Sequence, residues 1–375
     1  MSGLVVFHAE SSLGWGGQEI RIASEMRALR DRGYRLGLVA QPDSQILARI
    51  REDGFPVHAV RMRGALDVVA AATIARILRA EGVQILNTHS SVDAWVGGFA
   101  ARWLGVPVVR TRHLAIRIRR NPLAPRVYTW LADRVVTTGE DGRDILIRQA
   151  GVAPERIVAI PTGVDTERFH PERADRLRLR RELGIPEDTP VVGIVAVIRR
   201  RKGHLILLEA MLSPPLREQG VHLVVAGEGP IRGPVEARVE ALGLRERVHF
   251  LGYREDVPDV LAACDVVALP SIMGEGVPQT ILQALALGRP VVASDVAGIR
   301  QVVRHGETGL LVPAEDPQAL SQAIARLLAE PELGRRLGEA GRAVAVSTYA
   351  VHRMADAMER VYGEAVASAC GRRAR

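Results

Sequence analysis

Short apolar runs alternate with helix-like stretches in two successive series along this chain of 375 residues. The first series has runs at 4–8, 36–40, 57–60, 85–87, 106–109, 135–138 and 157–160, and the second has runs at 191–197, 223–226, 248–251, 266–269 and 291–293. Such alternation is typical of βαβ units, in which helices cover both faces of a parallel sheet. The pattern therefore predicts an α/β fold with two doubly wound, Rossmann-like domains.

The two series are separated by a charged segment. Residues 167–188 are rich in arginine and show no strand pattern, whereas the stretch from about 317 to 366 is almost entirely helical in pattern, with Pro331 as an interruption. The expected domains are therefore 1–165 and 166–347. Ligands of open α/β sheets bind beyond the carboxyl ends of the strands, and we expect two such sheets to face each other across a cleft. Residues just after strands are consequently the candidates for function.

The composition excludes several other classes of protein. Two cysteines, Cys264 and Cys370, cannot form a disulfide framework or hold zinc by themselves. No apolar run approaches the roughly 18 residues of a membrane-spanning helix. The apolar run at 4–8 is too short for a signal peptide and has no basic segment before it. These features predict a cytoplasmic protein.

The net charge of +7 is unevenly distributed. No acidic residue lies between Asp93 and Asp133, but seven arginines do: Arg102, Arg110, Arg112, Arg117, Arg119, Arg120 and Arg126. Such a cluster concentrates anionic partners, including anionic lipid headgroups; a solvated loop and helix face is the alternative interpretation. Lys202 is the one lysine among 50 basic residues, which suggests that a compact ammonium group is required there.

Three features of the first series follow predicted strands. The turn at 14–17 opens a helical pattern, and its Gly16 and Gly17 either let the backbone approach a ligand at a helix N-terminus or form a tight turn only. His89 and His113 each follow an apolar run, and His113 has arginines beside it. Nearby cations disfavour the imidazolium form, so a neutral ring could exchange a hydrogen bond with a reacting hydroxyl. A structural histidine bonded to a backbone carbonyl is the alternative.

In the second series, four cations from Arg199 to Lys202 follow the run at 191–197. Together with the N–H groups of a helix start they can neutralise a diphosphate; a solvated basic loop is the other interpretation. A turn that contains Gly227 and Gly229 follows the next run.

A loop flanked by glycines follows the run at 266–269 and contains Glu275. A carboxylate beyond a strand can accept hydrogen bonds from sugar hydroxyls, and Gln283, eight residues later in a helical pattern, can bond a ribose in the same way. A solvated loop acid is the alternative for Glu275.

Six motifs of the sequence occur in an order that matches a known family. They lie at 161–165, 199–203, 226–230, 275–283, 288–292 and 308–313. In this order they resemble the family 4 glycosyltransferases, which have the GT-B fold. The resemblance covers nearly the whole chain and is densest from 191 to 315. It implies that the C-terminal domain binds a nucleotide-sugar, that the N-terminal domain binds the acceptor, and that a last helix, about 348–375, packs back on the N-terminal domain.

The resemblance also implies roles for individual residues. Lys202 matches the diphosphate clamp, Glu275 the contact to the donor sugar, and His113 the histidine near the reacting centre; these three are the candidate catalytic residues. The positions expected to bind the donor are Gly16, Gly17, Arg199, Arg200, Lys202, Gly227, Gly229, Glu275, Gly276, Val277 and Gln283. The residues expected on the acceptor or membrane side are His89, Arg112, Arg117, Arg119 and Arg120.

By the same resemblance, we expect a transferase that retains anomeric configuration and needs no metal or other cofactor, because the cationic clamp stabilises the leaving diphosphate. The expected partners are a nucleotide-sugar and a saccharide or lipid-linked acceptor, with no nucleic acid. The basic cluster suggests an anionic membrane surface and a peripheral location on its inner face. Such an enzyme would act in cell-envelope polysaccharide, lipopolysaccharide or glycolipid synthesis.

Two other functions remain open at this point. Gln283 and Gln301 stand where the family has glutamates. The chain could therefore be an inactive nucleotide-sugar-binding partner subunit. A nucleotide-sugar epimerase or hydrolase of the same fold is the second alternative.

Overall fold

The computed structural model describes residues 3–118, 123–273 and 275–373. The chain forms two compact units. Unit 1 comprises the chain up to Gly163 together with the segment from Val351 onward, and unit 2 comprises Val164–Ala350. The first boundary lies two residues before the expected one (163 against 165), and the second lies three residues after it (350 against 347).

Unit 1 contains a seven-stranded parallel sheet with the strand order β3-β2-β1-β4-β5-β6-β7. Its strands are β1 (Val5–Glu10), β2 (Arg35–Ala40), β3 (Val57–Ala59), β4 (Ile85–Thr88), β5 (Val108–Arg112), β6 (Arg134–Thr137) and β7 (Ile157–Ala159). The central strands are buried on both faces, so each begins as an apolar run without polar alternation, and its polar residues lie toward its carboxyl end.

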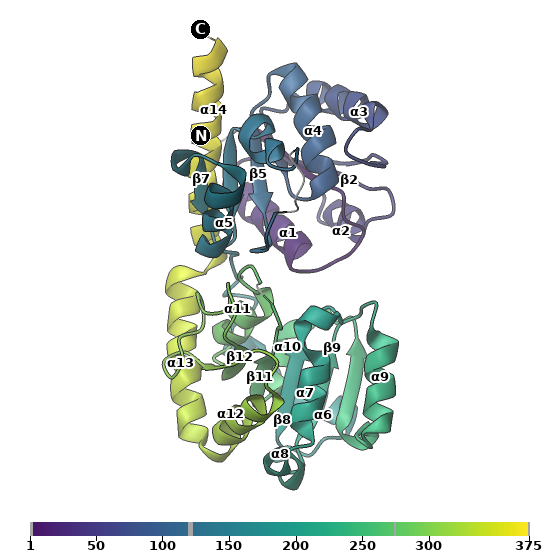
Figure 1. The fold of residues 1–375 in the computed structure, drawn as a ribbon, viewed down its shortest axis with the longest axis vertical. Coiled ribbons are helices and arrows are strands. Elements are labelled where there is room, and N and C mark those ends of the chain that lie inside the picture. Colours follow the sequence, from purple (N-terminus) through teal and green to yellow (C-terminus); the bar gives the residue numbers. More distant parts are fainter. Residues whose placement is uncertain (1–2, 119–122, 274, 374–375) are drawn as a thin grey trace. The chain divides into compact units, whose positions relative to one another are not determined.

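Helices cover both faces of this sheet (Figure 1). They are α1 (Gly17–Arg30), α2 (Gln45–Glu52), α3 (Val68–Ala80), α4 (Ser91–Leu104), α5 (Glu140–Ala150) and α14 (Val351–Arg373), with a π-helical turn η1 (Val127–Leu131) and a 3-10 turn η2 (Pro154–Arg156). Buried side chains of α1, α2 and α14 pack together against one face, and those of α3, α4 and α5 pack against the other.

Unit 2 contains a six-stranded parallel sheet with the order β10-β9-β8-β11-β12-β13. Its strands are β8 (Val191–Val195), β9 (His222–Ala226), β10 (Val248–Gly252), β11 (Val266–Leu269), β12 (Val291–Ser294) and β13 (Leu310–Val312). Its helices are α6 (Arg176–Leu183), α7 (His204–Met211), α8 (Pro214–Glu218), α9 (Arg232–Ala241), α10 (Val257–Ala263), α11 (Gln279–Ala286), α12 (Pro317–Ala329) and α13 (Pro331–Thr348), with 3-10 turns η3 (Pro171–Arg173), η4 (Arg200–Lys202) and η5 (Arg245–Arg247).

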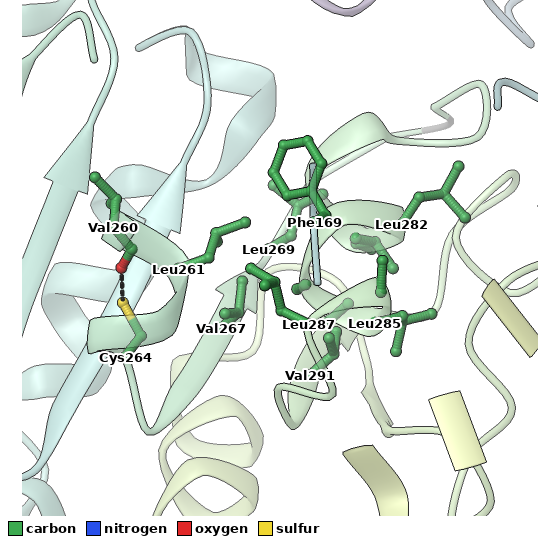
Figure 2. Close-up of a cluster of buried hydrophobic side chains, with 14 of the residues drawn as sticks. Phe169, Val260, Leu261, Cys264, Val267, Leu269, Leu282, Leu285, Leu287 and Val291 are labelled. Carbon is green, nitrogen blue, oxygen red and sulfur yellow. Dashed lines mark hydrogen bonds between the residues drawn. The ribbon is translucent and has the colours of Figure 1, made fainter. Parts of the chain in front are cut away.

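One of the apolar cores of unit 2 lies between the sheet and α10 and α11 (Figure 2). Cys264 is fully buried there and its thiol donates to the carbonyl of Val260 (3.1 Å). Burial raises the pKa of the Cys264 thiol to about 12, so this cysteine is inert. None of the helices in the described part of the chain combines the length and apolar character required to cross a bilayer.

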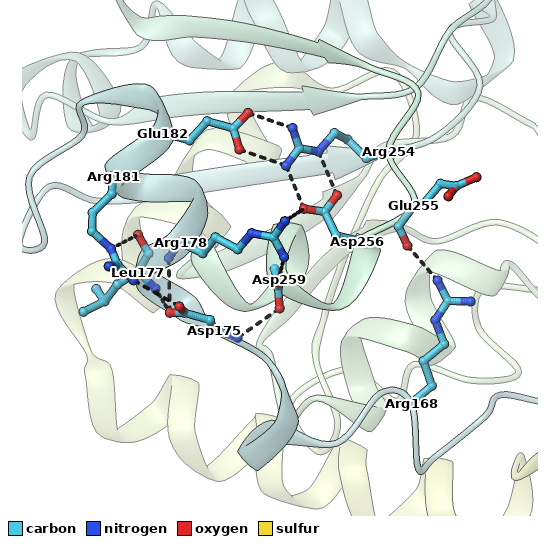
Figure 3. A network of polar contacts seen from close by, with 10 residues as sticks. All are labelled: Arg168, Asp175, Leu177, Arg178, Arg181, Glu182, Arg254, Glu255, Asp256 and Asp259. Carbon is cyan, nitrogen blue, oxygen red and sulfur yellow. Dashed lines mark hydrogen bonds and ion pairs between the residues drawn. The ribbon is translucent and has the colours of Figure 1, made fainter.

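The charged segment between the two series of strands is attached to unit 2 by ion pairs (Figure 3). It forms α6, whose N-terminus is capped by the carboxylate of Asp175. Arg254 pairs with Glu182 of α6 through two hydrogen bonds (2.7 and 2.9 Å) and also with Asp256. Arg178 pairs with Asp259 (2.9 Å). The high charge of the segment thus serves its attachment to α10 and the loop before it.

Candidate functional site

Each sheet has one point at which the strand order reverses direction. In unit 2 this point lies between β8 and β11, and in unit 1 between β1 and β4. The loops that leave two such strands diverge to opposite faces and open a crevice at the carboxyl edge, where ligands of doubly wound sheets bind. The predicted cationic segment follows β8, and the predicted Glu275 loop follows β11.

The structure brings Lys202 and Glu275 together at the carboxyl edge of unit 2. The ammonium of Lys202 lies 2.9 Å from Oε1 of Glu275, which also accepts a hydrogen bond from the hydroxyl of Ser271 (2.9 Å). Nη1 of Arg201 lies 3.7 Å from Oε2 of the same carboxylate. Burial lowers the pKa of Lys202, and the charge of Glu275 opposes that change. The result is a partly buried group of two cations and one carboxylate.

The four consecutive cations are not equivalent in the structure. Arg199 and Arg200 are exposed, whereas Arg201 and Lys202 turn toward Glu275. The chain enters the 3-10 turn η4 at Arg200, and the carbonyl of Arg201 accepts the amide of Ile272 from the loop after β11 (2.9 Å). This backbone bond joins the two loops and fixes Lys202 beside Glu275.

The glycines after β9 allow close packing between loops. Gly227 has a φ of +140°, and a Cβ on it would lie 2.1 Å from the carbonyl oxygen of Ala196. A Cβ on Gly229 would lie 2.3 Å from the carbonyl oxygen of Ile198. Both positions therefore require glycine for packing between the loops after β8 and β9, whether or not a ligand approaches them.

The other predicted donor contacts lie after β11. Val277 is buried in the apolar core, and Gly276 precedes it in the loop that carries Glu275. Gln283 lies on α11 with 9% of its surface exposed. The sequence placed Gln283 inside a helix, and the structure confirms that placement.

Three histidines form a hydrogen-bonded chain at the carboxyl edge of unit 1. Nδ1 of His8 lies 2.9 Å from Nε2 of His89, and Nδ1 of His89 lies 3.0 Å from Nε2 of His113. His89 and His113 follow β4 and β5 as the sequence predicted. His8 was not predicted as a site residue because it lies inside β1, where a polar side chain cannot be told from core by pattern alone. Burial lowers the pKa of all three rings.

Glu10 is a second polar residue that the sequence analysis missed. It ends β1 and is fully buried. Its carboxylate accepts hydrogen bonds from the amide of Ser12 (2.7 Å), the hydroxyl of Ser90 (2.5 Å) and the amide side chain of Gln18. Burial and the nearby charge of Asp93 raise the pKa of Glu10 to about 8. An acid between the first apolar run and the glycine-rich turn was the available signal, but the strand was expected to end at residue 8.

The glycine-rich turn also lies at this edge. Gly16 is the N-cap of α1, and its amide donates to the carboxylate of Glu19 (2.9 Å), while Gly17 begins the helix. Apart from its chain neighbours and the nearby backbone of α1, no heavy atom of the described residues lies within 4 Å of a Cβ built on Gly17. Both glycines belong to unit 1.

The predicted basic cluster divides into buried and exposed arginines. Arg112 is 8% exposed, and its guanidinium donates to the carbonyls of Leu114 (3.0 Å) and Ile116. It holds the loop after β5 and presents no charge on the surface. Arg110 is also buried, whereas Arg117 is exposed. Arg119 and Arg120 lie outside the described residues.

Within the described residues, no group of three or more His, Cys, Asp or Glu side chains is arranged to hold a metal ion. The independence from metal that the sequence suggested stays a prediction.

Two doubly wound sheets in one chain, with a cation–carboxylate group at the carboxyl edge of the second, are the architecture of GT-B glycosyltransferases. The structure of Anabaena HepE in complex with UDP and glucose has a TM-score of 0.86 and 23% identity, covering 96% of this chain and 99% of that one. A glycosyltransferase from Rickettsia africae gives a TM-score of 0.87 at 19% identity, covering 98% and 99%. These likenesses establish the fold.

The chain belongs to glycosyltransferase family 4. The family described as Glycosyltransferase Family 4 matches residues 15–168, and the one described as Glycosyl transferases group 1 matches residues 175–344. A D-inositol 3-phosphate glycosyltransferase of Saccharomonospora viridis is 32% identical over 82% of this chain and 77% of its own length. The UDP-Gal:α-D-GlcNAc-diphosphoundecaprenol α-1,3-galactosyltransferase of Escherichia coli is 30% identical over 70% of each. The protein is therefore a glycosyltransferase that uses a nucleotide-sugar donor.

Proposed function

We propose that unit 2 binds the nucleotide-sugar through its diphosphate and sugar, that unit 1 binds the acceptor, and that the sugar is transferred with retention of configuration. The observation that carries this proposal is the Lys202–Glu275 pair at the point where the sheet of unit 2 reverses its strand order. The solved complex of HepE with UDP and glucose, which has the same fold, supports a donor of this chemical class.

The chemistry follows from the charges of the group. Transfer places negative charge on the departing diphosphate and positive charge on the sugar carbon. A diphosphate competes with Glu275 for the ammonium of Lys202 and for the guanidinium of Arg201. When these cations bind the diphosphate, the carboxylate of Glu275 becomes free to accept hydrogen bonds from the sugar. The two cations then stabilise the leaving group without a metal ion. The acceptor attacks from the face that the diphosphate leaves.

On the acceptor side, we place His113 beside the reacting hydroxyl and expect an acceptor that carries negative charge. Two guanidinium nitrogens of the buried Arg110, Nε and Nη1, lack hydrogen-bond partners among the described residues. The relatives from Saccharomonospora and Escherichia coli are named for acceptors that carry phosphate, an inositol phosphate and a diphosphoundecaprenol. An acceptor that is anionic and lipid-linked would place this enzyme in cell-envelope polysaccharide, lipopolysaccharide or glycolipid synthesis.

An aromatic stripe supports contact with a membrane. Trp95, Phe99 and Trp103 are spaced four residues apart on α4, and the rings of Phe99 and Trp130 lie 5.8 Å apart. Trp103 is 76% exposed and Trp130 is 46% exposed, and Arg102 lies over the Trp130 ring (5.3 Å). This stripe contains three of the four tryptophans of the chain. Tryptophan and arginine together suit the headgroup level of a bilayer, so we propose peripheral binding through this face.

The donor is identified by thermal unfolding in the presence of UDP-, GDP- and ADP-sugars. A donor at ~100 times its Kd stabilises the protein by about 2.7 kcal/mol. K202A should abolish that stabilisation, because the diphosphate loses its ammonium partner. R336A, at an exposed arginine of α13, is the matched control and should keep it. Equal stabilisation of K202A and the unmodified protein would show that the diphosphate binds elsewhere.

The identified donor is then incubated with phosphate-bearing and lipid-linked saccharide acceptors. A sugar joined to an acceptor is the product of the proposed reaction. An altered or hydrolysed free sugar as the only product would instead support the epimerase or hydrolase. Donor binding without any turnover on such acceptors would support the inactive partner subunit.

A further inference from the structure

The hydrogen bonds between the three histidines of unit 1 couple their protonation. A neutral imidazole carries one N–H and one bare nitrogen. The two contacts join Nδ1 of His8 to Nε2 of His89, and Nδ1 of His89 to Nε2 of His113. Each contact needs one proton between its two nitrogens. With neutral rings, this condition is met only when all three carry the proton on Nε2 or all three carry it on Nδ1.

The two arrangements differ at both ends of the chain of rings. With every proton on Nε2, His113 presents a bare Nδ1, and Nε2–H of His8 points to the interior of unit 1. With every proton on Nδ1, His113 presents an N–H, and Nε2 of His8 is bare. Any mixed arrangement places two protons or two lone pairs at one contact, which leaves a buried hydrogen bond unmade.

The inner end of the chain of rings faces Glu25 of α1. Nε2 of His8 lies 4.0 Å from Oε1 of Glu25, and both side chains are fully buried. Nε2 of His8 and Oε2 of Glu25 lack hydrogen-bond partners among the described residues. Oε1 accepts the hydroxyl of Tyr362 from α14 (2.5 Å). A shift of about 1 Å, or one bridging water, closes the remaining gap between His8 and Glu25.

We propose that Glu25, His8 and His89 form a buried proton-transfer chain that serves His113, which the proposed function places beside the acceptor hydroxyl. The hydroxyl gives its proton to Nδ1 of His113 as its oxygen bonds to the sugar carbon. Nε2–H of His113 passes to Nδ1 of His89, Nε2–H of His89 passes to Nδ1 of His8, and Nε2–H of His8 passes to the carboxylate of Glu25. One proton thus enters at His113, and one proton is held on the carboxylate of Glu25. The reverse steps return a proton from Glu25 through the three rings, and His113 releases one to water.

The charges around the chain of rings favour transfer through neutral rings. The buried guanidiniums of Arg21 and Arg110 and burial itself disfavour imidazolium, and they hold the pKa of His89 and His113 well below the ordinary value. Burial raises the pKa of Glu25, while Arg21 and the Tyr362 hydroxyl oppose that rise. Asp93 is a further charged group beside the three rings, and its carboxylate accepts the amide of His89 (2.7 Å). Glu25 is thus the group in this set that is suited to hold the proton.

The test uses the whole protein with 15N-labelled histidine and no substrate. Long-range nitrogen–proton NMR spectra show which ring nitrogen is protonated. As the pH rises through the ionisation of Glu25, the three rings should change together from protons on Nδ1 to protons on Nε2, with one midpoint and no imidazolium signal. Rings that change at different pH values, that hold mixed tautomers, or that do not change while the protein stays folded would overturn the proposal.

A substitution tests the role of Glu25 directly. In E25Q the side-chain amide donates to Nε2 of His8, so all three rings should hold the proton on Nδ1 at every pH, including His113 two rings away. E81Q is the matched control, because Glu81 bonds His58 elsewhere in unit 1 (3.0 Å), and it should leave the three rings unchanged. An unchanged titration of His113 in folded E25Q would overturn the proposal. If E25Q does not fold, the titration of the unmodified protein decides.

This inference rests on the proposed function for the role of His113, but its readout does not. Absence of sugar transfer with coupled tautomers would contradict the proposed function alone. Transfer with independent tautomers would contradict the proton-transfer chain alone.

Discussion

Glu10 and Glu275 are both buried carboxylates at the carboxyl edge of a parallel sheet, but their surroundings differ. Glu275 has the ammonium of Lys202 at 2.9 Å. Glu10 accepts three hydrogen bonds from neutral donors, and the charges of Asp93 and Glu19 that act on it are negative. A buried carboxylate without a cation favours its protonated form. Near neutral pH Glu10 is therefore a neutral group that can donate a hydrogen bond.

The raised pKa of Glu10 predicts how stability depends on pH. Between pH 4.5 and about 8 the folded protein keeps a proton that the unfolded chain releases. The free energy of unfolding therefore falls as the pH rises through this range. E10Q removes the ionisation, so this fall should shrink by an amount on the order of a few kcal/mol. Denaturant unfolding of both proteins at several pH values across the range measures it.

The control for this measurement is E155Q, at an exposed glutamate of unit 1. It should leave the dependence on pH unchanged. A dependence that is equally steep in E10Q would mean that another group is responsible for it.

The residues predicted as functional from the sequence were those that follow strands, and Lys202, Glu275, His89 and His113 all lie at the carboxyl edge of their sheet. The residues that sequence reasoning missed or misplaced are those whose surroundings depend on contacts made only in the folded chain. His8 lies inside β1, and only the pairing of β1 with β4 brings its ring to His89. Arg112 was expected on the surface. It is instead the last residue of the buried strand β5, and its guanidinium donates to a carbonyl of the loop that follows.

At the level of elements, α14 completes unit 1 although all of unit 2 precedes it in the sequence. Its buried residues recur with helical spacing and pack against α1: Met354, Ala355, Met358, Val361, Tyr362 and Ala365. The sulfur of Met358 contacts the buried guanidinium of Arg21, and the Tyr362 hydroxyl donates to Glu25. The helix is therefore part of the core of unit 1.

Shortening one side chain of this stripe should destabilise unit 1 selectively. M358A removes a fully buried side chain, and such changes destabilise by about 2–5 kcal/mol. Amide hydrogen exchange should show reduced protection in α1 and α14, with the strands of unit 2 unaffected. R360A, at an exposed position of the same helix, is the control. Unchanged protection of α1 in M358A would show that α14 contributes little to the core of unit 1.

The order of the predicted strands agrees with the structure, with ends that differ by no more than three residues, because each central strand begins as a buried apolar run. β13 was not predicted as a strand, since its three residues between Gly309 and Pro313 are too short to show a pattern. The break between α13 and α14 was predicted only by the family resemblance, which places the last helix at about 348–375. No proline or glycine marks it; the carbonyl of Tyr349 accepts the amide of Val164 (2.7 Å), and this long-range contact ends the helix.

For the whole molecule, the proposed contact with a bilayer involves the exposed part of the basic cluster and the tryptophan stripe of unit 1. The sequence predicted a cluster of arginines but not which of them reach the surface: Arg110 and Arg112 are buried, while Arg117 is exposed. The tryptophans were not predicted at all, since their gathering requires α4 and η1 to be adjacent in space.

Reversal of one exposed charge tests this contact. R117E changes the charge by two units, and at ~1 kcal/mol per basic residue near the surface it should weaken binding to vesicles that contain an anionic phospholipid by at least about tenfold. R61E reverses an exposed arginine elsewhere in unit 1 and should bind as the unmodified protein does. Vesicle sedimentation measures both. Equal binding of R117E and R61E would remove Arg117 from the membrane side.

The chain passes between the units twice, at 163–164 and at 350–351, and the two crossings lie side by side through the bridge between Val164 and Ala350. Unit 2 is thus one continuous segment, but unit 1 is assembled from both sides of it. On the ribosome, α1 emerges long before the helix that buries it, so unit 2 can complete its core first. During synthesis, Met26 and Leu29 of α1 are translated more than 300 residues before the residues of α14 that belong to the same apolar core.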